Sequence, residues 1–216
     1  MAGRFIVFEG VDGCGKSTQA RRFVDWLNMT GKRAIYTRHP GATLIGAELR
    51  GLTAGREVDA NTKALLFAAD NSAFINQILI PHLGSDTWVI GDRNNFISSL
   101  AYQIADGCSL LQLEHIHAAT CTDPPKIDAL LIFSVTPEVA TARRASRSQE
   151  GKDIYEDKMN RREYFSRVAL AYDTMASGDP HGWLPKFVRS KPIAINGDRP
   201  EDEVFESVKI AISRMT

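Results

Sequence analysis

The chain has 216 residues, of which 44% are hydrophobic and 24% charged, a composition typical of a soluble globular protein. Its 26 basic residues balance its 26 acidic ones, which argues against a general nucleic-acid-binding protein, because such a protein would carry a basic surface. No apolar run reaches the roughly 18 residues of a membrane-spanning helix, and three cysteines without a CxxC pair are typical of reduced thiols, so we expect a cytoplasmic protein without a membrane partner.

Short apolar segments alternate with amphipathic ones along the chain. Continuous apolar runs predict strands buried on both faces, and apolar residues three or four apart predict helices. The predicted strands are residues 4–9, 33–37, 87–92, 129–135 and 192–196, and the predicted helices are 17–30, 62–80, 137–147, 156–177 and 200–214. This order predicts one three-layer α/β domain over residues 1–216, with a five-stranded parallel sheet covered by helices on both faces. The polar segment 146–154, between two helices, predicts a short lid.

The segment between the first strand and the first helix carries the most specific motif. Residues 8–19 read FEGVDGCGKSTQ, with four residues between Gly10 and Gly15-Lys16-Ser17. After a strand and at the start of a helix, this spacing predicts a loop whose backbone N–H groups surround the phosphates of ATP. Lys16 is expected to bridge the β- and γ-phosphates, and Ser17 to offer its hydroxyl to Mg²⁺. The predicted ATP-binding residues of this loop are Gly10, Val11, Asp12, Gly13, Cys14, Gly15, Lys16, Ser17 and Thr18.

Charged residues follow the second and third predicted strands, at the end where ligands collect in an open α/β sheet. Arg38 follows the second strand, and Asp92 and Arg93 end the third. Together with Lys16, the two arginines give more positive charge than one triphosphate needs, which predicts a second anionic substrate. Asp92 is expected to steady Mg²⁺ alongside Ser17. No second acid follows Asp92 to activate water, and this favours phosphate transfer over hydrolysis.

Further segments, in matching order and spacing, resemble the thymidylate kinases, the P-loop enzymes that phosphorylate dTMP with ATP. TRHPGAT at 37–43 is similar to their TREPGGT, and GDRNNFISSLAYQ at 91–103 to their DRY…SSLAYQ. LLFAADN at 65–71 stands in the place of their LLF-type helix, and VTPEVATARRASR at 135–147 resembles the helix that enters their lid. The resemblance covers nearly the whole chain. It implies a P-loop kinase fold, ATP and dTMP as substrates with Mg²⁺, and a homodimer.

The resemblance also implies roles for individual side chains. Asp12 would bond the 3′-hydroxyl of the acceptor, and Arg143 would pack on the adenine of ATP. Because Gly13 stands where some members of the family carry a basic residue, the cation that stabilises transfer would come from the lid, with Arg147 first, then Lys152 and Arg144. The implied catalytic residues are Lys16, Arg93, Arg147 and Asp12.

The acceptor site is implied in the same way. Arg38 and Arg93 would hold the 5′-phosphate, Phe67 would stack on the base, and Tyr102 would crowd out a ribose hydroxyl. Polar side chains would complete the base pocket. The implied dTMP-binding residues are Asp12, Arg38, Phe67, Asn71, Arg93, Ser99, Tyr102 and Gln103.

Three departures from the family pattern bear on this site. His39 replaces the Glu of TREPGGT, Asn71 replaces the arginine that reads the thymine carbonyl, and the loop after Arg93 is one residue longer, with Asn94 in place of Tyr. A deoxynucleoside-monophosphate kinase of broader or different base specificity therefore stays open. The alternative from another class is a non-catalytic P-loop nucleotide sensor, which has little use for a basic lid beside an acceptor pocket.

Overall fold

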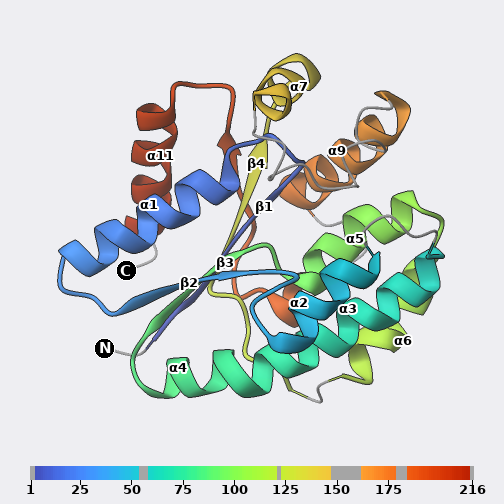
Figure 1. Ribbon diagram of the computed structural model, residues 1–216. Coiled ribbons are helices and arrows are strands. Elements are labelled where there is room, and N and C mark those ends of the chain that lie inside the picture. The colour runs from blue at the N-terminus through green and yellow to red at the C-terminus, as the bar shows by residue number, and fades with distance from the viewer. Residues whose placement is uncertain (1–2, 54–57, 121–122, 147–161, 179–183, 215–216) are drawn as a thin grey trace.

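The computed structural model describes residues 3–53, 58–120, 123–146, 162–178 and 184–214. A five-stranded, all-parallel sheet lies at its centre with helices on both faces (Figure 1), which confirms the expected α/β fold. The strands, in the spatial order β2-β3-β1-β4-β5, are β1 (Phe5–Gly10), β2 (Ala34–Arg38), β3 (Trp88–Asp92), β4 (Ala129–Ser134) and β5 (Ile193–Asn196).

The inner strands are buried along almost their whole length because helices cover both of their faces. Every residue of β1 and β3 is buried, whereas the edge strands β2 and β5 are partly exposed. In the parallel register, Phe8 pairs with Asp92 on β3 and with Leu131 on β4, and Asp92 pairs in turn with Arg38 on β2. The carboxyl ends of these strands therefore meet at one edge of the sheet.

The first helix buries the apolar face that its sequence predicts. Helix α1 (Lys16–Met29) buries Phe23 and Leu27 against the sheet, and Phe23 contacts Phe8. Helix α11 (Glu201–Ser213) packs beside α1 on the same face (Figure 1), and Arg22 of α1 forms ion pairs with the first turn of α11. These two helices form one outer layer.

The opposite face is covered by a long helical rod and by further helices. The rod consists of α3 (Ala60–Phe74), a π-helical turn η1 (Ile75–Leu79) and α4 (Ile80–Gly84). A single helix over 62–80 was expected. The π turn lies just before Pro81, which lacks an N–H and disfavours regular α-helical bonding in the preceding turn. The remaining helices are α2 (Leu44–Thr53), α5 (Asn95–Ala105), α6 (Leu110–Ala118), α7 (Pro137–Ala145), α9 (Arg162–Ser177) and α10 (Leu184–Phe187).

Helix α7 ends two residues before the end expected from the sequence. Of the lid predicted at 146–154, the structure describes only Ser146, so Arg147 and Lys152 lie outside the described residues. Within the described part of the chain, no helix combines the length and the apolar character that crossing a membrane requires.

Candidate active site

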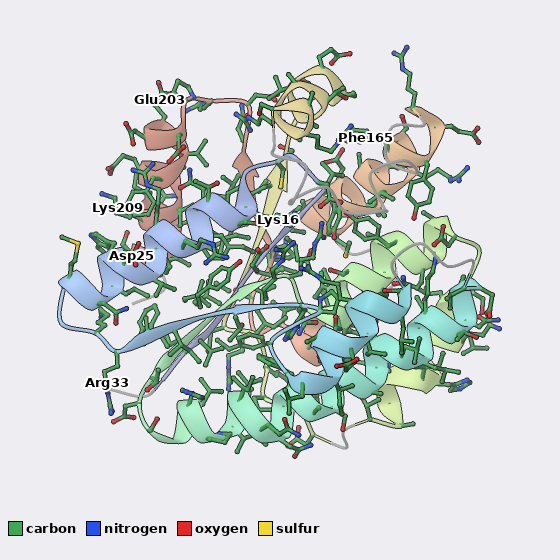
Figure 2. The ribbon with its side chains drawn as sticks, in the orientation of Figure 1. Lys16, Asp25, Arg33, Phe165, Glu203 and Lys209 are labelled. Atoms are coloured by element: carbon green, nitrogen blue, oxygen red, sulfur yellow. The ribbon has the colours of Figure 1, made fainter. Side chains whose placement is uncertain are left out.

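The phosphate loop runs from the end of β1 to the start of α1, at the carboxyl edge of the sheet. Figure 2 shows Lys16, the first residue of α1, near the centre of the molecule. Its side chain is buried, and Nζ lies 3.4 Å from the carbonyl oxygen of Val11 and 3.4 Å from Oδ1 of Asp12. An ammonium group at the N-terminal end of a helix, within a glycine-rich loop, is suited to binding phosphate.

Arg93 is held in a network of four side chains from three other parts of the chain. Nη2 donates to Asp12 Oδ1 (2.6 Å) and to the Tyr102 hydroxyl (3.0 Å), and Nη1 donates to the Tyr172 hydroxyl (3.1 Å). Nη1 also lies 3.4 Å from Oε2 of Glu9, whose carboxylate is fully buried. Burial alone would lower the pKa of Arg93, but the two tyrosines and the two carboxylates raise that pKa well above its usual value. The guanidinium therefore stays charged and fixed in direction.

The carboxylate expected to steady a metal ion lies beside the loop. Asp92 is buried, Oδ2 accepts a hydrogen bond from the Tyr36 hydroxyl at 2.6 Å, and the Ser17 hydroxyl bonds the same carboxylate. Burial alone would raise the pKa of Asp92, but the charge of Lys16 and these hydrogen bonds lower it below its usual value. An ionised carboxylate next to a serine hydroxyl supplies the oxygen ligands that Mg²⁺ prefers, so the residues fit the expected ion.

Two cavities flank the phosphate loop. One is lined by six of the residues expected to bind dTMP: Asp12, Arg38, Phe67, Arg93, Tyr102 and Gln103. The other is lined by Gly13, Cys14, Gly15, Thr18 and Arg143 of the expected ATP site, and by the segment that follows β5. Asp12 and Gly13 are neighbours in the chain, so the two cavities meet at the loop.

Comparison with known proteins agrees with the resemblance to thymidylate kinases that the sequence shows. The family model described as thymidylate kinase matches residues 8–185. The thymidylate kinase of Thiobacillus denitrificans is 36% identical over 183 residues, which is 84% of this chain and 86% of that protein. The thymidylate kinase of Desulforudis audaxviator is 37% identical over 85% of this chain and 82% of that protein, and that of Trichormus variabilis is 30% identical over 99% and 97%.

The chain belongs to the thymidylate kinase family. Within that family it departs from the common sequence pattern at the three places noted above, and the structure locates each of them. All three lie in or beside the cavity that contains Arg38 and Phe67, which we call the acceptor cavity.

Two residues expected in the acceptor cavity do not line it. Asn71 lies one turn beyond Phe67 on α3, and it lines a separate cavity with Phe96 and His117. Ser99 is fully buried, and its neighbour Ser98 lines the acceptor cavity instead. The assignment of Asn71 and Ser99 to the base pocket stays a prediction.

His39, which replaces the family's glutamate, is buried and lines the acceptor cavity. Its ring packs edge-on against Phe74 with centroids 4.1 Å apart, and neither ring nitrogen has a hydrogen-bond partner among the described residues. Burial lowers its pKa to about 4, although Asp70 and Asp92 act in the opposite direction. At neutral pH the ring is therefore neutral.

Helix α7 packs directly on the phosphate loop. Gly13 has φ +92°, and a Cβ there would lie 2.6 Å from the carbonyl oxygen of Ala140, so this position cannot carry a side chain unless α7 shifts. Arg144 is buried, and its Nη1 donates to the Asp12 carbonyl at 3.1 Å. Arg144, expected as a third candidate for the transfer cation, therefore holds the loop backbone.

Three further features of the site were not expected from the sequence. Arg50 of α2 lines the acceptor cavity, and the loop after β5 accepts a hydrogen bond from Arg143 Nη1 through the Gly197 carbonyl at 2.8 Å. Glu9 orders the loop after β3, because Oε1 accepts bonds from the Asn94 backbone N–H and the Ser98 hydroxyl, each at 2.8 Å. The glutamate of FEGVDG was a visible signal for this last role, since a charged residue in a buried strand needs partners.

Proposed function

We propose that the protein is a thymidylate kinase, which transfers the γ-phosphate of ATP to the 5′-phosphate of dTMP and yields ADP and dTDP for dTTP supply. An oxygen of the acceptor phosphate attacks the γ-phosphorus, and the bond from that phosphorus to the β–γ bridging oxygen breaks. The observation that carries the proposal is the pair of cavities that meet at the loop bearing Lys16 and Asp12. One cavity adjoins the phosphate loop and suits ATP, and the other is lined by arginines that suit a second anionic substrate.

The acceptor cavity contains three arginines. Arg38 and Arg93 hold the 5′-phosphate, and Arg50 lines the same cavity as a further cation. Asp12, already bonded to Arg93, bonds the 3′-hydroxyl of the sugar and so ties the acceptor to the phosphate loop. With both substrates held in line, catalysis consists of positioning and of neutralising the charge on the transferred group.

The nucleoside of the acceptor lies along the remainder of this cavity. Phe67 provides a flat apolar surface for the base, and Gln103 an amide at its edge. Tyr102, fixed by its bond to Arg93, crowds the C2′ position of the sugar. A ribonucleotide would place its hydroxyl against this ring.

The donor side is completed by the phosphate loop, by Arg143 on the adenine, and by Arg147 as the lid cation. Ser17 and Asp92 would hold Mg²⁺, which when bound neutralises part of the charge on the β- and γ-phosphates. Tyr36 holds Oδ2 of Asp92. Lys16 would bridge the same two phosphates.

We place the enzyme in the cytoplasm as a single domain over residues 1–216. Cys14 and Cys108 are buried free thiols, and burial raises the pKa of both, which fits a reducing compartment. We further propose a homodimer through the long helical rod, where Leu65 and Ile80 are exposed apolar side chains. Sedimentation velocity should give twice the chain mass, and Leu65→Glu should lower it; a wild-type monomer would contradict the dimer.

The decisive experiment is ADP release measured with ATP, Mg²⁺ and a panel of monophosphate acceptors. We expect release to depend on added dTMP and to be fastest with it. Comparable rates with dTMP and dGMP would replace the thymine assignment by a kinase of broader base specificity. Binding of ATP without any acceptor-dependent release would favour the non-catalytic nucleotide sensor.

A further inference from the structure

Asn95 lies in the acceptor cavity at a position created by the longer loop after Arg93. It is the first residue of α5, directly after Asn94, whose side chain caps the helix by accepting from the backbone N–H groups of Phe96 and Ile97. Asn95 is 3% exposed and lines the cavity. The structure therefore buries an amide side chain against the space in which the acceptor nucleotide is placed.

The carboxylate of Asp70 fixes the direction of this amide. Asn95 Nδ2 donates to Asp70 Oδ2 at 2.8 Å, and Asp70 Oδ1 accepts from the Thr43 hydroxyl at 2.7 Å. Asp70 is fully buried and does not line the cavity, whereas Asn95 does. An ionised carboxylate only accepts hydrogen bonds, so the NH₂ end of the amide must face it. The Oδ1 end then remains for a ligand, since no described residue donates to it.

The amide lies close to the surface assigned to the base. Phe67 and Asp70 are three residues apart on α3, and side chains at this spacing are neighbours on one helix face. Asn95, bonded to Asp70, therefore lies about one helical turn from the Phe67 ring. A base stacked on Phe67 brings its hydrogen-bonding edge toward this part of the cavity.

We propose that Asn95 determines base specificity by accepting a hydrogen bond from the N3–H group of a 2,4-dioxopyrimidine, with Asp70 as the residue that sets its direction. The inference rests on the proposed function, because it assigns the edge of the acceptor base. Thymine and uracil both present N3–H to an acceptor. Cytosine presents an unprotonated N3, so two acceptors would face each other and the Asn95 oxygen would stay buried without a donor.

Gln103 cannot make this distinction by itself. It also lines the acceptor cavity, but no described residue bonds its side-chain amide. An amide whose direction no described residue fixes can offer either its oxygen or its NH₂ group, and so serves thymine and cytosine alike. Discrimination requires an amide that cannot turn, and the Asp70 carboxylate supplies that constraint to Asn95.

The test compares kcat/KM for dTMP, dUMP and dCMP in the wild type, Asn95→Ala and Asp70→Asn. In Asn95→Ala we expect dTMP and dUMP to lose about 10- to 100-fold together, with little change for dCMP, so that the dTMP/dCMP ratio collapses and the dTMP/dUMP ratio is kept. In Asp70→Asn the neutral amide no longer forbids rotation of Asn95, and dCMP should gain relative to dTMP. Asn76→Ala, at an exposed asparagine of η1, is the matched control and should leave all three values unchanged.

The ratios are measured within one preparation of each variant, so a partly unfolded sample does not alter them. A dTMP/dCMP ratio that stays at the wild-type value in both variants would overturn the assignment of Asn95, while the kinase activity itself would stand. If wild-type enzyme does not phosphorylate dTMP at all, the proposed function fails instead.

Discussion

Replacement of Arg93 by alanine should lower kcat by about 10³- to 10⁵-fold, the range that a guanidinium contributes when it stabilises phosphoryl transfer. Arg93 lines the acceptor cavity and its direction is fixed by Asp12, Tyr102, Tyr172 and Glu9. Its guanidinium presents several N–H donors in one rigid plane, which no other type of side chain offers to a phosphate. Steady-state kinetics with saturating ATP and dTMP measures the loss.

The same substitution should also destabilise the fold, which provides an independent check. Removal of Arg93 leaves the buried carboxylate of Glu9 without its cation, and breaking a buried ion pair in this way costs about 3 to 5 kcal/mol. Denaturant unfolding of Arg93→Ala should report this decrease in the free energy of unfolding. Glu9 keeps three neutral hydrogen-bond donors, so the variant is expected to fold.

Two further variants separate charge from geometry. Arg93→Lys keeps the charge but loses the forked donors, so it should recover stability more than activity. Arg189→Ala, an arginine that is 64% exposed and paired with Asp128, is the matched control and should change neither quantity appreciably. A folded Arg93→Ala enzyme that keeps more than half of the wild-type rate would exclude Arg93 from the transfer step.

Replacement of Lys16 by methionine should lower turnover by about 10³-fold or more, with a much smaller effect on stability. Methionine has a similar length but no charge, so it fills the same buried space. The Lys16 ammonium lies 3.4 Å from Asp12, and Arg93 already binds that carboxylate at 2.6 Å. The buried Asp92 loses the charge of Lys16 when the ammonium is removed but keeps the hydrogen bonds of Tyr36 and Ser17, so neither carboxylate is left without a partner.

A large loss of rate with little loss of stability would indicate that the Lys16 ammonium serves catalysis rather than the fold. Phosphate-release or ADP-release assays give the rate, and thermal unfolding without nucleotide gives the stability. Lys32→Met, at a partly exposed lysine beside Trp88, controls for loss of a positive charge. A Lys16→Met enzyme with near wild-type turnover would show that the loop binds phosphate without using this ammonium.

Much of the fold and the donor half of the site could be predicted because the relevant patterns are local. Each of the five strands was expected within one residue of its observed bounds, since a strand buried on both faces is a short continuous apolar run. The phosphate loop needs Gly10, Gly15 and Lys16 at fixed spacing, so the sequence reveals it directly. Arg38 and Asp92 were expected to meet because residues that end parallel strands lie at one edge.

The acceptor pocket was only partly predicted, because its lining depends on how helices pack. Asn71 lines a second cavity and Ser99 is fully buried, so neither is among the residues that line the acceptor cavity. Asn95 and Arg50 enter it from a longer loop and from α2, a helix that the sequence analysis did not predict.

The sequence by itself therefore determined the class of fold, the phosphate loop and the family, which depend on residue order and short-range spacing. Only the tertiary structure decided which amides line the acceptor cavity, that Arg144 holds the phosphate loop, and that Glu9 and Tyr172 fix Arg93. These contacts join residues far apart in the chain, up to 163 positions for Tyr172 and Glu9, and their geometry follows from packing that no local pattern encodes.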